Sequence, residues 1–443
     1  MSVSTADAIA QAVAAPPPEW PDAPLCVGFS GGLDSTVLLH ALAASPRVRE
    51  RGLRAWYVHH GLHPGADDWA RHCAEFCAAL GLELTVSRVS VAQTGGDGPE
   101  AAARRARHAA FEAGLGEGEI LALAHHLDDQ AETLLLRLLR GSGPDGLASM
   151  RAWRDCGRGR LWRPLLNLPR EALQAYALNH RLSWIDDPSN KDDRFDRNFL
   201  RHRVMPLLRE RWPQANAAFA RSAHLSDEAT RLLESEDALA LAQVRSLDPQ
   251  ALSRSALLAL PRARRARVLR RWIAELGLPP LPARGVARIE SEVLPARADA
   301  AAEFAWNGAQ VRAWRDLLHA QSPRPALPPH WRTAWDGRAA LELPHGGQWR
   351  LQGTDGFELP VHAHTRGGGE RIVLPGRSHA HALKHVLQQL GVPPWERERL
   401  PLLSTASGEL CAVGDLIYGA NFDRWLRERG ARLVWRDRDG GLD

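Results

Sequence analysis

The chain has 443 residues, 44% of them hydrophobic, which is enough for about three domains with buried cores. No apolar run approaches the length of a membrane span, which argues against a membrane protein and a signal peptide. The five cysteines include no C-x-x-C pair, which argues against a disulfide framework and a zinc ribbon and favours the cytoplasm. The net charge is only +4, but all except two of the 56 basic residues are arginine, which suits phosphate, so nucleic acid is a candidate partner unless the genome simply favours arginine codons.

The first predicted strand, Leu25 to Phe29, leads through a glycine turn into a helix, Ser35 to Ala44. The turn consists of Ser30, Gly31, Gly32, Leu33, Asp34 and Ser35. Two glycines allow a tight turn and the helix start adds the positive end of its dipole, so the turn is suited to an anion such as phosphate. A Walker A loop would also need a lysine, and the only two lysines lie far away in the sequence. The alternative is a plain turn between strand and helix.

Short apolar strands and amphipathic helices alternate over the first 215 or so residues. Further strands are expected at Ala55 to His59, Leu82 to Val89 and Ile120 to Ala124, and further helices at Asp67 to Leu80, Pro99 to Ala113 and Asp128 to Arg140. Such a βαβ series predicts a mostly parallel sheet with its ligand at the carboxyl ends of the strands.

The most specific polar cluster follows the fourth of these strands, in AHHLDDQAET at residues 124–133. Asp129 and Glu132 are three residues apart at a helix start and share a face, so they could bind a magnesium ion or a cationic substrate. The alternative is that the helix dipole simply favours acids at this end. Four histidines near strand ends also permit a histidine–carboxylate metal site, although nothing completes the ligand set. They are His59, His60, His125 and His126.

The second half of the chain changes character. From about Asp227 to Ala320 the pattern is helical and rich in arginine, and four prolines between Pro323 and Pro329 indicate a linker. Beyond the linker, short strands alternate with Gly and Pro turns around one clear helix, Ala380 to Leu390. Residues 330–355 are assigned only to β structure.

Taken together, many segments resemble bacterial tRNA(Ile)-lysidine synthases, members of the PP-loop ATP pyrophosphatases, whose SGGxDS loop matches Ser30–Ser35. The matching segments are residues 30–36, 57–62, 98–104, 124–133, 139–147, 163–166, 184–190, 197–202, 368–371, 383–384 and 392–397. The resemblance implies an α/β fold in three parts. We expect a parallel-sheet, adenine nucleotide α-hydrolase-like PP-loop domain at residues 1–215, a helical middle domain at 216–325, and a small α+β tRNA-binding domain at 326–443.

The resemblance also implies a reaction: ATP adenylates the C2 oxygen of the wobble cytidine in the CAU-anticodon isoleucine tRNA, and free lysine then displaces AMP to form lysidine. We expect ATP to lie against Ser30–Ser35 with His60 and His126, and Mg²⁺ to bind Asp34. Asp129 and Glu132 would hold and deprotonate the lysine ammonium, and Arg104 would contact phosphate. The expected tRNA contacts are Arg197, Arg201, Arg371 and Lys384.

Each of these roles has a plainer alternative. The arginines would be solvated surface residues in an arginine-rich chain, and the histidines would be hydrogen-bonded at strand ends. A PP-loop tRNA thiolase is the rival enzyme, but Cys73 and Cys77, at i and i+4 of a predicted helix, suggest packing rather than sulfur transfer. A third possibility is an RNA-binding protein with an inactive loop. The oligomeric state, a homodimer included, is left open.

Overall fold

The computed structural model describes residues 5–14, 22–61, 63–90, 99–297, 302–359 and 361–436. The chain forms two compact units, Met1–Ser235 and Glu236–Asp443. Two residues of the sequence motifs, Leu62 and Gly98, lie outside the described ranges. Within those ranges, no helix is long and apolar enough to cross a membrane.

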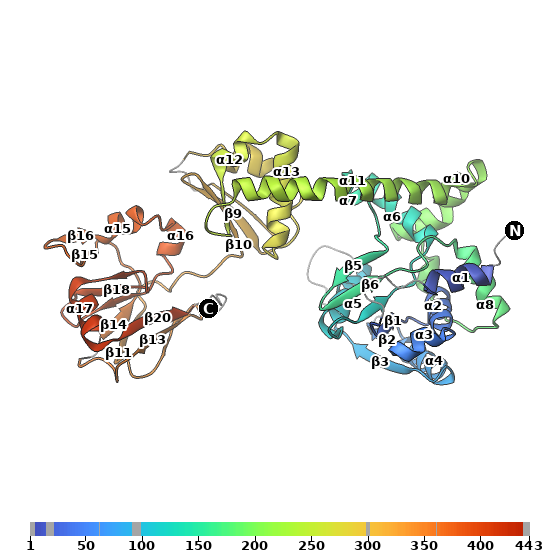
Figure 1. The fold of residues 1–443 in the computed structure, drawn as a ribbon, viewed down its shortest axis with the longest axis horizontal. Coiled ribbons are helices and arrows are strands. Elements are labelled where there is room, and N and C mark those ends of the chain that lie inside the picture. The colour runs from blue at the N-terminus through green and yellow to red at the C-terminus, as the bar shows by residue number, and fades with distance from the viewer. Residues whose placement is uncertain are drawn as a thin grey trace. The chain divides into compact units, whose positions relative to one another are not determined.

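The first unit is built on a six-stranded sheet with the order β3-β2-β1-β4-β6-β5 (Figure 1). Its strands are β1 (Leu25–Gly28), β2 (Leu53–His59), β3 (Glu83–Arg88), β4 (Ile120–Ala122), β5 (Trp153–Cys156) and β6 (Gly159–Trp162). All neighbouring pairs are parallel except the β5–β6 hairpin at one edge. The parallel sheet and all four expected strands are therefore confirmed, and the edge hairpin is an addition.

Helices pack on both faces of this sheet because its central strands, β1, β2 and β4, are apolar on both sides. Alternate residues such as Leu25 and Val27 face a core shared with α1 (Thr5–Ala14), α2 (Leu33–Ala43), α4 (Ala66–Ala79) and α8 (Arg170–Asn179). Cys26 and Leu121 face the opposite core, which α5 (Pro99–Gly114) covers. The other helical segments are α3 (Pro46–Arg51), α6 (Leu127–Leu139), α7 (Pro144–Leu147), η1 (Pro188–Lys191), α9 (Asp196–Phe199), η2 (Leu200–Val204) and α10 (Met205–Arg211). Helix α11 (Ala215–Val244) begins in the first unit and ends in the second.

The second unit begins with a region that the sequence analysis expected to be helical. Helices α12 (Arg254–Ala259), α13 (Arg262–Glu275), α14 (Ala283–Arg288) and η3 (Ile289–Val293) are present. They pack on an antiparallel sheet of β7 (Ala251–Ser253), β10 (Leu317–Gln321), β9 (Ala309–Trp314) and β8 (Glu303–Trp306). The purely helical expectation was wrong here. An Asn307-Gly308 turn with positive φ at both residues joins β8 to β9, and this dipeptide is a strong hairpin signal that was missed.

The rest of the second unit combines three sheets with short helices, as expected for an α+β fold. The strands are β11 (Arg332–Trp335), β12 (Leu341–Glu342), β13 (Gln348–Gln352), β14 (Val361–His364), β15 (Arg371–Val373), β16 (Ala380–Ala382), β17 (Leu402–Ser404), β18 (Leu410–Val413), β19 (Ile417–Tyr418) and β20 (Arg432–Arg436). The expected helix appears as α15 (Leu383–Gln389), with α16 (Pro394–Arg397) after it. The sequence analysis missed α17 (Ala420–Arg429), which buries Phe422 and Leu426.

Candidate active site

A cavity of about 580 Å³ opens at the carboxyl ends of β1, β2 and β4 in the first unit. This is the position expected for a ligand of a parallel sheet. Its wall includes most of the glycine turn, His60 and Asp129, together with several residues that the sequence analysis did not single out. These are Trp56, Arg107, Phe111, Arg170, Trp184, Asn190 and Lys191. Aromatic rings and cations on one wall are suited to a ligand with both a flat ring and negative charge.

The glycine turn is held in one conformation by contacts with its neighbours. Gly31 has a φ of +77°, and a Cβ there would lie 2.5 Å from Cδ1 of Ile185, so glycine is required on both counts. The Ile185 amide donates to the Gly31 carbonyl at 2.8 Å, and the Ser30 amide donates to Oγ of Ser35 at 3.2 Å. The turn is therefore a fixed part of the cavity wall that leads directly into α2.

Asp34 stands in the first turn of α2, and its side chain is 34% exposed. Its Oδ1 is buried and has no hydrogen-bond partner within the described part of the chain. Oδ2 lies 3.7 Å from Nε2 of His126. A buried carboxylate oxygen without a donor costs free energy, and a cation would relieve that cost.

Helix α6 starts with a buried group of acids. The His126 amide donates to Oδ2 of Asp129 at 3.1 Å, so Asp129 also caps the start of the helix, a contact that the sequence analysis did not expect. Asp129 also borders the cavity, whereas the Glu132 side chain is only 1% exposed. The expected shared face is thus present, but only one of its two carboxylates borders this cavity.

Arg197 and Arg201 contact both of these carboxylates. Arg197 donates to Oε2 of Glu132 at 2.8 Å and to Oδ1 of Asp129 at 2.9 Å. Arg201 donates to Oε1 of Glu132 at 2.7 Å and to Oδ1 of Asp129 at 3.1 Å. The two arginines are four residues apart and therefore share a helical face. They are only 20% and 23% exposed, so they are not solvated surface residues but half of a four-membered ion cluster.

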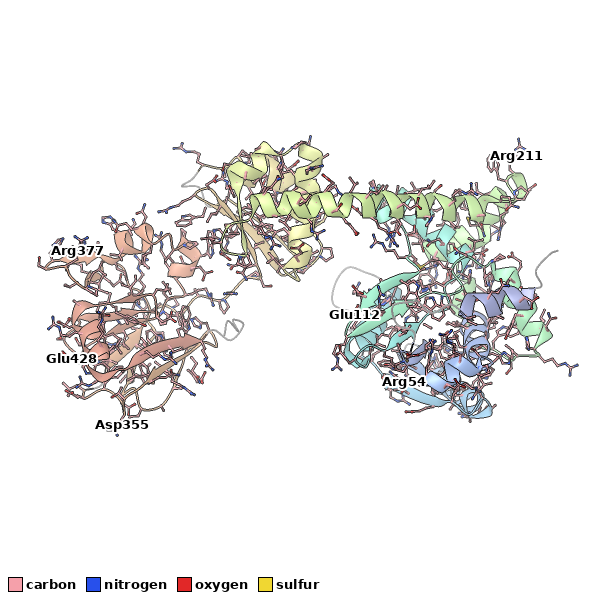
Figure 2. All side chains as sticks on the ribbon, in the orientation of Figure 1. Arg54, Glu112, Arg211, Asp355, Arg377 and Glu428 are labelled. Atoms are coloured by element: carbon pink, nitrogen blue, oxygen red, sulfur yellow. The ribbon has the colours of Figure 1, made fainter. Side chains whose placement is uncertain are left out.

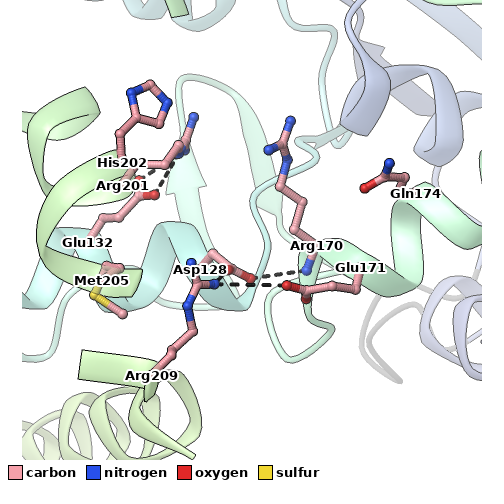
Figure 3. A pocket seen from close by; sticks show the side chains of 9 residues that line it. All are labelled: Asp128, Glu132, Arg170, Glu171, Gln174, Arg201, His202, Met205 and Arg209. Carbon is pink, nitrogen blue, oxygen red and sulfur yellow. Dashed lines mark hydrogen bonds and ion pairs between the residues drawn. The ribbon is translucent and has the colours of Figure 1, made fainter. Parts of the chain in front are cut away.

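A second cavity, of about 210 Å³, lies beside this cluster (Figure 3). Its wall consists of Asp128, Glu132, Arg170, Glu171, Gln174, Arg201, His202, Met205 and Arg209. Asp128 accepts hydrogen bonds from the Arg170 amide at 3.0 Å, from Asn216 at 2.8 Å and from Arg209 at 3.2 Å. Because Arg170, Arg201 and His202 also border the larger cavity, the two cavities share a wall.

The two neighbouring histidines before α6 have opposite surroundings. Burial would lower the pKa of His126, but Asp129, Asp128 and Asp34 raise it to about 10. The His126 side chain is 1% exposed and does not border the larger cavity, in contrast to the expectation that it would contact the nucleotide. Burial raises the pKa of Asp129, but His126, Arg197 and Arg201 outweigh this effect and hold the pKa well below its usual range. His125, which the sequence analysis considered only as one of four possible metal ligands, borders the cavity instead.

Two further expectations concern α5 and the second strand. Arg104 is exposed on α5 and does not border the cavity, whereas Arg107, three residues further along the helix, does. A spacing of three places both on neighbouring parts of one helical face, which could have identified Arg107. His60 borders the cavity as expected, and burial followed by Arg107 and His59 lowers its pKa.

The two basic residues expected to contact tRNA near the end of the chain are both exposed. Arg371 lies in β15 and donates to the Ala380 carbonyl at 2.5 Å, and Lys384 lies in the first turn of α15. Arg377, labelled in Figure 2, projects from the turn between β15 and β16. The loop before β15 contains three consecutive glycines, residues 367–369. Glu370 at its end accepts hydrogen bonds from the Gly367 and Gly368 amides at 2.6 and 2.7 Å, which hold the loop in a tight turn.

Three family models match this chain. One described as a PP-loop domain matches residues 3–208, one described as a TilS substrate binding domain matches residues 252–319, and one described as a TilS substrate C-terminal domain matches residues 361–435. Together they account for most of both units.

Similar proteins are known over nearly the full length. The tRNA(Ile)-lysidine synthase of Xanthomonas campestris pv. campestris (strain 8004) is 54% identical over 421 residues, which are 95% of this chain and 96% of that protein. The one from Xylella fastidiosa (strain Temecula1) is 51% identical and covers 96% of this chain and 98% of its own. The solved U34-tRNA thiolase NcsA from Methanococcus maripaludis is 18% identical, with a TM-score of 0.41 over 52% of this chain and 78% of that one.

Proposed function

Because the chain belongs to the tRNA(Ile)-lysidine synthase family, we propose that it joins free lysine to C2 of the wobble cytidine in the CAU-anticodon isoleucine tRNA, at the expense of ATP. As a family member it is an enzyme with an ATP-binding PP-loop domain. The observation that best supports the finer proposal is that one cavity is bordered both by the glycine turn and by Asp129 and Arg201. An anion site and a site for a cation therefore share one space.

We propose that ATP binds in the larger cavity. The glycine turn and the start of α2 suit its phosphates, and Trp56 and Phe111 offer apolar surface to the adenine. Asp34, with its unpartnered Oδ1, suits a magnesium ion, which proteins commonly hold by one or two carboxylates together with substrate phosphates. Bound there, magnesium would neutralise phosphate charge during adenylation.

Adenylation turns the C2 oxygen of the cytidine into part of a good leaving group. The ε-amine of lysine then attacks C2 and AMP departs. We propose that Asp129 is the first counter-charge for the lysine ammonium, because it borders the cavity and its depressed pKa keeps it ionised. Such a carboxylate is a weak base, so its main task is to hold and orient the ammonium.

Glu132 and the two arginines complete this proposal. A lysine ammonium at Asp129 would exchange with part of the hydrogen bonds from Arg197 and Arg201, and the released guanidinium groups have phosphate as a natural partner. Glu132 anchors both arginines, so their role as phosphate or tRNA contacts would depend on it. The three-part domain division at residues 215 and 325 also stays a proposal, which the limits of the three family models support.

The rival thiolation reaction needs a reactive thiolate. Burial raises the pKa of Cys73 to about 12 and that of Cys77 to about 11, which leaves both as thiols at neutral pH. The proposed function is tested by incorporation of labelled lysine into a panel of tRNA transcripts, measured together with pyrophosphate release. We expect lysine incorporation and repeated turnover of pyrophosphate release to require ATP, lysine and the CAU-anticodon isoleucine tRNA. Many turnovers of pyrophosphate release without lysine, or sulfur incorporation, would refute the proposal.

A further inference from the structure

Of the two histidines that immediately precede α6, His125 is the one that borders the larger cavity. The Nε–H of Arg163 donates a hydrogen bond to its Nδ1 at 3.2 Å. The Arg163 residue is only 7% exposed, and its guanidinium also donates to the Arg151 carbonyl at 2.7 Å, so it is fixed from two directions.

This contact determines where the proton of His125 resides. A guanidinium group has only donors, so Nδ1 of His125 must accept and cannot carry a hydrogen. The ring is then either neutral with its proton on Nε2 or not bound to Arg163 at all. Among the described residues, no group accepts a hydrogen bond from Nε2 of His125. Its Nε2–H group is therefore available to a molecule in the cavity that His125 borders.

The surrounding charges favour the same neutral form. Burial first, and then Arg163, Arg197 and Arg107, hold the pKa of His125 well below its usual range against the opposing effect of Asp129. The neighbouring His126 is in the opposite position, because three carboxylates surround it and raise its pKa to about 10. Different neighbours thus shift the pKa values of two successive residues in opposite directions.

We propose that His125 is a catalytic residue that, as a neutral imidazole with its proton on Nε2, donates a hydrogen bond to a phosphoryl oxygen of the nucleotide during adenylation, and that Arg163 is the positioning residue that fixes this tautomer. This inference rests on the proposed function for its substrate. A neutral donor adds a hydrogen bond without adding another positive charge to a wall that already contains Arg107 and Arg201. No proton is transferred, so the contact works at any pH at which the ring stays neutral.

Three substitutions of His125 distinguish the contribution of Nδ1 from that of Nε2. The amide nitrogen of His125→Gln reaches roughly as far as Nε2, so this variant keeps a donor for the cavity. The shorter His125→Asn keeps an acceptor for Arg163 but withdraws the donor, and His125→Phe removes both. We expect the rate of AMP formation at saturating substrates to fall about a hundredfold in the Asn and Phe variants and less than about tenfold in the Gln variant. The affinity for ATP should change much less than this rate.

The tautomer is measured directly by nitrogen NMR of the full-length protein carrying ¹⁵N-labelled histidine, with His125→Asn identifying the signal. We expect a neutral ring protonated at Nε2 between pH 6 and pH 8, and a change of that signal when ATP is added. A proton on Nδ1, an imidazolium at pH 7, or an Asn variant as active as the Gln variant would overturn the proposal. Failure of lysine transfer would instead contradict the proposed function, because the tautomer and its response to ATP do not depend on lysine.

Discussion

The charges around the cavity of the first unit and those on the C-terminal surface of the second unit are arranged in opposite ways. In the first unit, Glu132 is 1% exposed and receives hydrogen bonds from two arginines that are themselves mostly buried. In the second unit, Arg371 and Lys384 are exposed around one small hairpin and helix. Buried, paired charges keep a fixed geometry, whereas exposed ones adapt to a large polyanion.

This difference separates two tasks. Chemistry at a reacting atom requires groups held in place before the substrate arrives, because small displacements are costly. Contact with a phosphate backbone gains affinity mainly from counterion release and tolerates mobile side chains. We therefore expect substitutions in the first unit to affect turnover and stability, and substitutions on the C-terminal surface to affect tRNA affinity and its salt dependence.

The largest expected effect is at the glycine turn. Asp34→Ala should abolish AMP formation while the protein stays folded, because it removes the unpartnered carboxylate oxygen that suits a magnesium ion. Quenched assays of AMP formation, with circular dichroism as the check on folding, measure this. Asp68→Ala, which removes an exposed acid of α4, is the matched control and should retain activity. Normal turnover by a folded Asp34→Ala protein would contradict the metal role.

The next effect tests whether the buried ion cluster serves lysine. Glu132→Gln should raise the lysine concentration needed for half-maximal rate about ten- to a hundredfold, since charge-assisted contacts contribute roughly 1.5 to 3 kcal/mol and this acid anchors both arginines. The ATP requirement should move far less. Steady-state kinetics with lysine as the varied substrate measure both.

Stability must be followed in the same variant, because a buried charge that loses its partner is destabilising. Glu234→Gln, in which an exposed partner of Arg151 is neutralised, is the control for the chemical change itself. A lysine requirement equal to that of the unaltered protein, in a folded Glu132→Gln enzyme, would show that the cluster only supports the fold.

The sequence predicted the local elements of this site better than the contacts between distant residues. The glycine turn and the paired acids of α6 are local patterns, and each is found where it was expected. The pairing of Arg197 and Arg201 with those acids spans more than 60 positions of the chain and has no local signal. His125 and His126 are adjacent in the sequence, so only their neighbours in space could reveal that their pKa values shift in opposite directions.

The same limit applies to the fold. Parallel strands were readily predicted because the central ones, β1, β2 and β4, are apolar on both faces. The strands at residues 303–321 lie in a region dominated by helical periodicity, and there the Asn307-Gly308 turn was a better signal than composition.

A third prediction tests whether crowded cations in the first unit affect its stability. Burial, followed by Arg107, Arg154, Arg104 and Arg163, lowers the pKa of His108 to about 4. The unfolded chain therefore binds this proton at a higher pH than the folded protein does. Stability is retained above about pH 6.5 and is lost as the pH falls towards 4.

Because His108 is only partly buried, we expect this loss to be about 1–2 kcal/mol rather than the full value implied by the shift. Urea unfolding of the first unit at pH 7.5 and pH 5, compared between the unaltered protein and His108→Gln, isolates the contribution. The variant should lose less stability on acidification. Identical pH dependence in the two proteins would mean that the cationic surroundings of His108 are well screened by solvent.

The smallest expected effect is on tRNA affinity and concerns the C-terminal surface that carries Arg371 and Lys384. The most informative quantity here is the dependence of that affinity on salt concentration. Replacing both Arg371 and Lys384 by alanine should weaken tRNA binding about fivefold near physiological salt, because each exposed cation contributes modestly. If both side chains bind phosphates, the plot of log affinity against log salt should become shallower by about 1.5 to 2, since each phosphate that is no longer neutralised keeps close to one counterion.

Replacing both Arg332 and Arg350 by alanine removes two exposed arginines from β11 and β13, which lie in other sheets. This double variant controls for the change in net charge and should leave the slope nearly unaltered. The ATP requirement should be unchanged in all variants, because these residues belong to the second unit. An unchanged slope in the variant that lacks Arg371 and Lys384 would exclude direct phosphate binding by these two residues and leave tRNA recognition to the first unit and the sheet of β7 to β10.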